Sequence, residues 1–471
     1  MKQLLFLAMK NVILVLTTLF ALTPKATCAV GAIHEGGYEV AYISSYLGKV
    51  SDSEAIKAAF EDLSKSIYKK LIIDVDVHID YAVLLPSNTI LELQADIYQN
   101  DKYYDSLDSL VEHSEKLYGN FDNVIRGANV TFDEEAIAKL PAQTYKAKGY
   151  MKDRRRIDHY VPIVYPQHVD QLTNIKIIGN HHKIVASKHV PYGYHTRITG
   201  GGYKGQEGEE EMRGDDWGSR GILMAFSNCN DVYIENVTLC DAHCYALSFD
   251  LCQNVTIKDI SIYSPVDIDA EEDGIDIRTG CKNFGIDSVH AETGDDAIAI
   301  NAGMYGKLNS RSYPLGNNRY LYPLEASINN YHGMTDEDLD VSDIVVRNVK
   351  SRRVSSDGRT AIILADLGRT VSSVVFENFE ELEGSKQNPK NPTIRIYNNT
   401  KDRTEALLGR VRDVRINKIK AVTSNVVVKG DLDCTNVSLS NLSPKRGGRA
   451  YDITIPRAGS QKVYKGFRIN Q

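Results

Sequence analysis

A short unit recurs along most of the chain and constrains the fold more than any other feature of the sequence. Each copy reads polar, apolar, any residue, apolar, as in residues 174–177. The eight copies begin at Asn174, Asp231, Asn254, Asn283, Asp343, Ser373, Asp413 and Asn436. Clean neighbours lie 23, 29, 30 and 23 residues apart, and gaps of 57, 60 and 40 residues leave room for further coils and insertions. Short strands with period-two alternation at such intervals predict an all-β solenoid of parallel strands.

A helix is predicted mainly on the N-terminal side. Residues 51–63 carry a polar cap candidate between Ser51 and Ser53, early acids and apolar residues at helical spacing. A solenoid needs its open end covered, and this helix could do that. We therefore expect one solenoid domain over residues 30–471 with an N-terminal capping helix. Segments of different composition predict loop insertions near residues 99–160, 191–220 and 303–335.

Residues 1–29 have the pattern of a secretory signal peptide. Lys2 and Lys10 lead an apolar run over residues 12–22, which is followed by Ala26-Thr27-Cys28-Ala29. No second apolar run in the sequence is long enough to span a bilayer, so no transmembrane segment is expected. The prediction is a secreted, periplasmic or cell-surface protein, with a lipid anchor at Cys28 as the alternative.

The charge balance bears on the partners. Removing the three signal-peptide lysines moves the formal charge from −7 to about −10, which argues against a nucleic-acid partner. A capped solenoid needs no partner chain, so a monomer is expected.

The cysteines favour packing over metal binding. Cys229, Cys252 and Cys281 stand at the same phase of the repeat, which predicts a ladder of small buried side chains. Cys240 and Cys244 are the pair to consider if a disulfide forms. The spacing lacks the paired motifs of zinc sites, and we expect neither a metal nor a cofactor.

Two related segments carry the candidate catalytic residues. Residues 271–277 read Glu-Glu-Asp-Gly-Ile-Asp-Ile, and 23 residues later residues 294–300 read Gly-Asp-Asp-Ala-Ile-Ala-Ile. If 23 residues make one coil, Asp273 and Asp296 lie on adjacent strands roughly 4.8 Å apart, with Asp295 beside them. Crowded carboxylates raise the pKa of at least one member, so a protonated acid and an ionised base coexist, as glycoside hydrolysis requires. A calcium site or solvated turn acids are the alternatives.

Alternation along the strand adds one residue to this face. Ile275 and Ile277 point inward, so Asp276 is expected to point outward toward substrate.

The two segments resemble the Asn-Thr-Asp and Gly/Gln-Asp-Asp motifs of polygalacturonases and relatives, glycoside hydrolase family 28. Residues 84–92 and 161–179 resemble early coils of pectin-lyase-like proteins, and residues 394–397, Ile-Arg-Ile-Tyr, resemble the family's Arg-Ile-Lys segment. The resemblance implies a right-handed parallel β-helix, Asp295 as general acid, Asp273 and Asp296 as the residues that hold and activate water, and Arg395 as a substrate-binding residue.

Three positions depart from the family pattern. The family's Gly-His-Gly has no counterpart, since the expected phase falls either in the insertion or on residues 356–360, Ser-Asp-Gly-Arg-Thr. Tyr397 replaces the lysine of Arg-Ile-Lys as a candidate substrate-binding residue, and Glu271 replaces the first asparagine. The prediction is a polysaccharide-degrading, inverting hydrolase that is not an ordinary polygalacturonase. A polysaccharide lyase and a non-catalytic carbohydrate-binding surface protein are the alternatives.

Overall fold

The structure is a computed structural model that describes most of the repeat region. It covers residues 33–80, 82–100, 125–127, 129–132, 167–186, 222–242, 245–264, 272–302, 313–316, 319–321, 337–355, 358–365, 368–384, 388, 390–397, 409–430, 434–453 and 467–470. The predicted signal peptide and nearly all of the three predicted insertions lie outside these residues. Among the described residues no helix has the length and apolar character needed to cross a bilayer.

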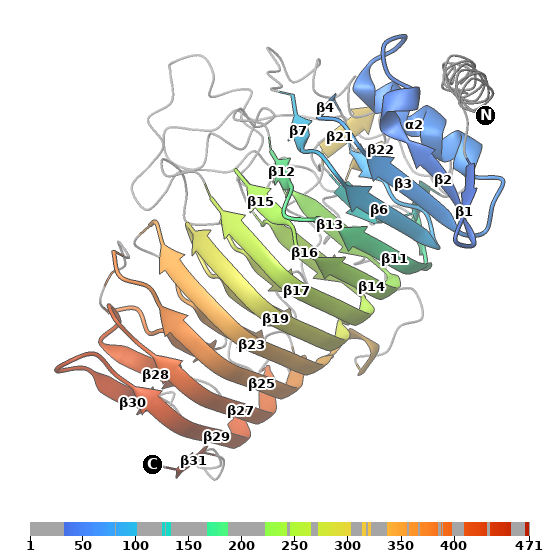
Figure 1. The fold of residues 1–471 in the computed structure, drawn as a ribbon. Helices are drawn as coiled ribbons and strands as arrows, with labels where there is room; N and C mark the ends of the chain where they lie inside the picture. Colours follow the sequence, from blue (N-terminus) through green and yellow to red (C-terminus); the bar gives the residue numbers. More distant parts are fainter. Residues whose placement is uncertain are drawn as a thin grey trace, which may run out of the picture.

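Two long sheets run along the molecule, and within each sheet the strands of successive coils lie side by side (Figure 1). The smaller one, which carries the site described below, has ten parallel strands among the described residues. They are β5 (Val83–Leu84), β8 (Ile125–Gly127), β13 (Met224–Ser227), β16 (Leu247–Asp250), β18 (Ile275–Ile277), β20 (Ile298–Ala302), β24 (Ala361–Ala365), β26 (Ile394–Tyr397), β28 (Val426–Gly430) and β30 (Arg449–Ile453).

The larger sheet has 17 strands in the described part of the chain, parallel except for the first pair. They are β1 (Ile33–Glu35), β2 (Tyr38–Tyr42), β3 (Lys69–Ile73), β4 (Val77–Ile79), β6 (Thr89–Leu93), β7 (Ile97–Gln99), β11 (Leu172–Ile178), β12 (Lys183–Val185), β14 (Cys229–Glu235), β15 (Thr238–Cys240), β17 (Gln253–Tyr263), β19 (Lys282–Thr293), β23 (Val341–Arg353), β25 (Thr370–Glu381), β27 (Arg410–Lys420), β29 (Cys434–Ser443) and β31 (Phe467–Asn470). Two antiparallel pairs lie apart from it, β9 (Asn129–Phe132) with β10 (Gln167–Asp170) and β21 (Tyr313–Gly316) with β22 (Arg319–Leu321).

From β16 onward, apart from the β21–β22 pair, the chain alternates between the two sheets, so that each pair of successive strands makes one coil. Each strand then pairs in parallel with the strand of the same sheet one coil later. The fold class predicted from the sequence, an all-β parallel β-helix, is confirmed.

The polar residue that begins each repeat unit has a conformational role. In all eight copies it has a positive φ, between 55° and 60°. Asn and Asp tolerate this left-handed conformation better than other residues with a side chain, which explains why they dominate the position. Their amides also stack from coil to coil: Asn283 donates to Asn254 (2.5 Å), and Asn254 donates to Asn230 (2.7 Å). The repeat therefore marks the same backbone bend in eight strands of the larger sheet.

The core lies between the sheets and consists mainly of Ile, Val, Ala and Leu. The predicted cysteine ladder is confirmed in its main point: Cys229, Cys252 and Cys281 are fully buried in this core and form no disulfide. Cys240 is also free, and Cys244 lies outside the described residues.

Helix α2 (Asp52–Leu63) begins where the sequence indicates. The Ser51 hydroxyl accepts a hydrogen bond from the Glu54 amide (3.4 Å). Its apolar side, which includes Ala55, Ile56 and Leu63, joins the core beside β2 and β4. In Figure 1 the helix lies at the N-terminal end of the stack. Two single-turn 3-10 helices, at Ile43–Ser45 and Glu337–Leu339, complete the described helical structure.

Candidate active site

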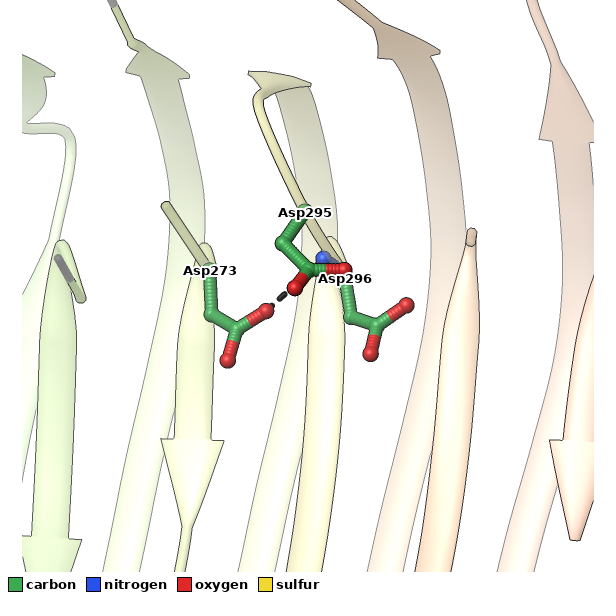
Figure 2. A group of neighbouring side chains, drawn as sticks. All are labelled: Asp273, Asp295 and Asp296. Carbon is green, nitrogen blue, oxygen red and sulfur yellow. Dashed lines mark hydrogen bonds between the residues drawn. The ribbon is translucent and has the colours of Figure 1, made fainter. Parts of the chain in front are cut away.

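Three carboxylates meet at the amino ends of two adjacent strands of the ten-stranded sheet. One glycine separates Asp273 from the first residue of β18, and Asp295 and Asp296 lie shortly before β20. One oxygen from each carboxylate lies within 4.8 Å of the other two (Figure 2). The Asp296 amide donates to Asp273 Oδ1 (2.7 Å), which fixes the two loops to each other. The predicted juxtaposition of the three acids on neighbouring coils is thus what the structure contains.

Gly274 makes this close approach possible. A Cβ atom at residue 274 would lie 2.4 Å from the carbonyl oxygen of Ala297 on the next coil. Its amide donates to the carbonyl of Asp296 (2.8 Å). Only a residue without a side chain lets the two loops pack at this distance.

The three acids differ in their surroundings. Asp273 is 8% exposed and Asp296 is 3% exposed, while the side chain of Asp295 is 19% exposed. Burial raises the pKa of Asp273 well above its usual value, and the charges of the neighbouring acids add to the shift. Burial also raises the pKa of Asp296, but Arg359 opposes that shift. Asp295 is therefore the acid that a bulky ligand reaches most easily, and of the two buried acids Asp273 retains its proton more strongly than Asp296.

Arg359, which the sequence analysis did not assign, supplies the positive charge of the site. Its Nη1 atom lies 3.4 Å from Asp296 Oδ1 and 3.9 Å from Asp295 Oδ1. The amide of Ala297 donates to the carbonyl of Arg359 (3.0 Å), so this residue lies one coil beyond the paired aspartates. Gly358 packs directly against the backbone of Asp295, where a Cβ would lie 2.3 Å from its carbonyl oxygen. Residues 358–360, one of the two alternatives for the missing Gly-His-Gly, lie beside the acids, and most of the other alternative, the insertion near 303–335, lies outside the described residues.

A second buried ion pair braces the segment that carries Arg359. Arg353, at the end of β23, donates to the carbonyl of Gly358 (3.1 Å) and to Glu381 Oε1 (2.6 Å). Glu381 in turn accepts hydrogen bonds from the amides of Val422 and Thr423 (both 2.7 Å). The site is thus held in place from the larger sheet.

Arg395 and Tyr397 both lie on β26, two strands from the acids. Ile362 of β24 pairs with Arg395, and Leu364 with Tyr397. The Arg395 guanidinium lies over the Tyr397 ring, 4.3 Å from its centre. Burial raises the pKa of the Tyr397 hydroxyl, and the charge of Asp296 raises it further. The structure therefore brings these two residues to the same region as the acids, with Arg395 held by its aromatic neighbour.

The prediction of a surface carboxylate is wrong for Asp276. Its side chain leaves the core, as alternation predicts, but it is fully buried. It accepts hydrogen bonds from Asn301 Nδ2 (2.8 Å) and from Arg278 Nη1 (3.3 Å). Arg278 also lies 3.7 Å from Asp250 and over the Tyr245 ring. Alternation gives the direction of a side chain but not what covers it, and here an internal polar cluster does.

The three acids are the group of described residues whose spacing would suit a metal ion. A calcium ion takes about six to eight oxygen ligands. Here an oxygen of Asp273 accepts the Asp296 amide, and Asp296 faces a guanidinium. These three carboxylates therefore suit the guanidinium of Arg359 better than a calcium ion.

Comparison with known proteins defines the class. A model of the glycosyl hydrolases family 28 matches residues 185–455, more than half of the chain. The chain therefore belongs to this family of glycoside hydrolases.

Three relatives give the range of similarity. A stretch of 101 residues is 33% identical to a probable polygalacturonase of Arabidopsis thaliana, and it spans 21% of this chain and 22% of that protein. An exopolygalacturonase of Thermotoga maritima has 14% identity and a TM-score of 0.44, with 93% of each chain covered. An endo-xylogalacturonan hydrolase of Aspergillus tubingensis has 12% identity and a TM-score of 0.45, with 92% of this chain and 98% of that chain covered.

Proposed function

We propose that the protein is a secreted polysaccharide hydrolase that uses Asp295 as general acid and Asp273 with Asp296 to hold and activate water. The observation that carries the proposal is the meeting of three carboxylates within 4.8 Å in three different environments. Asp295, the most exposed, protonates the glycosidic oxygen as the bond to the anomeric carbon breaks. Water then attacks that carbon and gives its proton to the more buried acids.

Inversion is the stereochemical outcome that we propose. Asp296, whose rise in pKa is opposed by Arg359, ionises more readily than Asp273 and takes the proton of the water, while Asp273 helps to hold that water. Because both side chains are buried, a water molecule reaches them more readily than a sugar ring does.

One observation favours retention as the second candidate. The facing oxygens lie within 4.8 Å, shorter than the roughly 6.5–9.5 Å usual between the carboxyl groups of inverting enzymes and close to the about 5–5.5 Å of retaining ones. Proton NMR of the first-formed anomer distinguishes the two outcomes.

The substrate is proposed to be a polysaccharide other than plain galacturonan. The family's lysine is Tyr397 here, and a half-buried phenol with a raised pKa carries no positive charge to meet a uronate carboxylate. Arg395 remains as a substrate-binding candidate, since it is partly exposed beside the site. We keep Asp276 out of this role because of its burial.

The test uses purified mature protein and a panel of pectic, algal and neutral polysaccharides. New reducing ends and the ultraviolet absorbance of unsaturated sugars are followed together. The proposal is supported if reducing ends form without unsaturated products, and if the rate of their formation falls by roughly 10²- to 10⁴-fold in Asp295→Asn. Unsaturated products identify a lyase instead, and tight binding without turnover identifies a carbohydrate-binding protein. Full activity of Asp295→Asn refutes the assigned mechanism.

Export is proposed from the first 29 residues of the sequence. Mass spectrometry of the mature N-terminus tests it: a start at residue 29 or 30 supports cleavage of a signal peptide, and a lipid mass on Cys28 supports the anchored alternative.

A further inference from the structure

We propose that Arg359 is the positioning residue that decides which carboxylate of this site is ionised, through a permanent cation at the place where the family's Gly-His-Gly is due. The inference rests on the proposed hydrolase function. It concerns a residue that departs from the family pattern, and it assigns the base role to Asp296 ahead of Asp273.

The backbone around Arg359 is fixed against the loop of the paired aspartates. Gly358 contacts Asp295 so closely that no side chain fits between them. Further upstream, the amide of Val354 donates to the carbonyl of Thr293 (2.9 Å), and the Ser355 hydroxyl donates to the carbonyl of Gly294. Because the residues before Arg359 are tied to residues 293–295, the backbone of Arg359 is held beside the acids.

Few charged groups face Arg359. The acids Asp295 and Asp296 lie on the β20 side, Arg353 lies on β23, and Tyr397 with Arg395 lies on β26. Burial alone would lower the pKa of Arg359, but the charges of Asp296 and Asp295 outweigh this and raise it. The guanidinium therefore stays charged at any working pH.

The cation acts unequally on the acids. It lies 3.4 Å from Asp296 and opposes the rise in pKa that burial causes there. The largest influences on Asp273 are burial and three neighbouring acids, all of which raise its pKa. As pH rises, Asp296 consequently ionises before Asp273. A histidine at position 359 would supply this charge only below a pH of about 6.5.

The experiment compares Arg359→Lys, Arg359→His and Arg359→Gln over pH 4–9 with the substrate found in the panel. Arg359→Gln removes the charge, so the acid limb of the kcat profile moves to higher pH and activity falls by roughly 10- to 100-fold. Arg359→Lys and Arg359→His keep a charge at acid pH, so their acid limbs stay near the wild-type position. If only the shape of the side chain mattered, the histidine and glutamine variants would shift together, and that result overturns the proposal.

A matched control is Arg347→Gln, which removes an exposed arginine 3.4 Å from Glu377 on the outer face of the larger sheet. Its profile is expected to match the wild type.

A second readout does not depend on turnover. Carboxyl ¹³C NMR of Asp-labelled protein follows the three acids in wild type and in Arg359→Gln. A carboxyl that titrates at higher pH in Arg359→Gln supports the inference even if no polysaccharide is cleaved, in which case the proposed hydrolase function fails alone. Identical carboxyl titrations in the two proteins overturn the inference.

Discussion

Two buried carboxylates on neighbouring parts of the same solenoid have opposite protonation chemistry. Glu381 is 1% exposed and Asp273 is 8% exposed. Burial would raise the pKa of Glu381, but the charge of Arg353 and hydrogen bonds from residues 423 and 424 lower it to about 2. Burial raises the pKa of Asp273, and neighbouring acids raise it further.

The difference lies in the donors, because burial is similar at both places. Glu381 accepts from a guanidinium, three backbone amides and several hydroxyls. Asp273 accepts one backbone amide and faces other carboxylates. The first arrangement stabilises a charge and holds a loop, while the second keeps a proton available.

The largest expected effect comes from neutralising Asp273. Asp273→Asn should lower kcat by roughly 10²- to 10⁴-fold, because it removes a group that holds and activates water. Since the folded-state pKa is raised, ionising Asp273 costs stability increasingly as pH rises above its unfolded value of 3.8. The variant should therefore be as stable as wild type at pH 7, or more stable, in thermal unfolding. Asp231→Asn, at an exposed bend with φ 59°, is the control for activity and stability. A variant that loses both would place Asp273 with Glu381 as a structural acid.

Neutralising Glu381 should have the reverse profile. Glu381→Gln leaves Arg353 buried beside a neutral group and is expected to cost about 3–5 kcal/mol of unfolding free energy. Denaturant unfolding measures this loss. The double variant Arg353→Met with Glu381→Leu should recover part of the stability, because no charge then remains buried. A loss below about 1 kcal/mol in the single variant would contradict the comparison.

The pH dependence of stability should separate the two acids. A depressed pKa in the folded state means that the Glu381 contribution is fully present above its usual value of 4.5 and disappears as pH falls toward about 2. The shift corresponds to about 3 kcal/mol. Unfolding free energies of wild type and Glu381→Gln between pH 2 and 5 check this: the difference between them should shrink as pH falls. A difference that is constant over this range would show that the carboxylate charge is not responsible.

The sequence was informative where a local pattern sets geometry. The 23-residue interval brings Asp273 beside Asp296, because one coil separates them and β18 pairs with β20 in register. The same holds for the first residue of each repeat unit, whose φ explains its identity.

The sequence was less informative where distant segments meet. The gap of 60 residues between the units at Asn283 and Asp343 left two alternatives for the coil after the paired aspartates, so the sequence did not assign Arg359 to the site. The burial of Asp276 depends on Arg278 and Asn301, which alternation cannot reveal. The place of Arg359 and the burial of Asp276 both depend on long-range packing, which the repeat pattern does not predict.

The smallest expected effect concerns the aromatic support of Arg395. Tyr397→Leu removes a ring 4.3 Å from the guanidinium and should weaken substrate binding by about 0.5–2 kcal/mol, read as a rise in KM with little change in kcat. Tyr397→Phe keeps the ring, so its KM should differ from that of the wild type by no more than a few tenths of a kcal/mol of binding free energy.

If the phenylalanine variant instead loses kcat, the hydroxyl works with Asp296 in the chemistry, and Tyr397 belongs with the acids of the site. If it matches the leucine variant in KM, the hydroxyl contacts the sugar directly. Only the predicted split between the two variants assigns Tyr397 to holding Arg395, a structural task like that of Arg353 beside Glu381 but at the edge of the site.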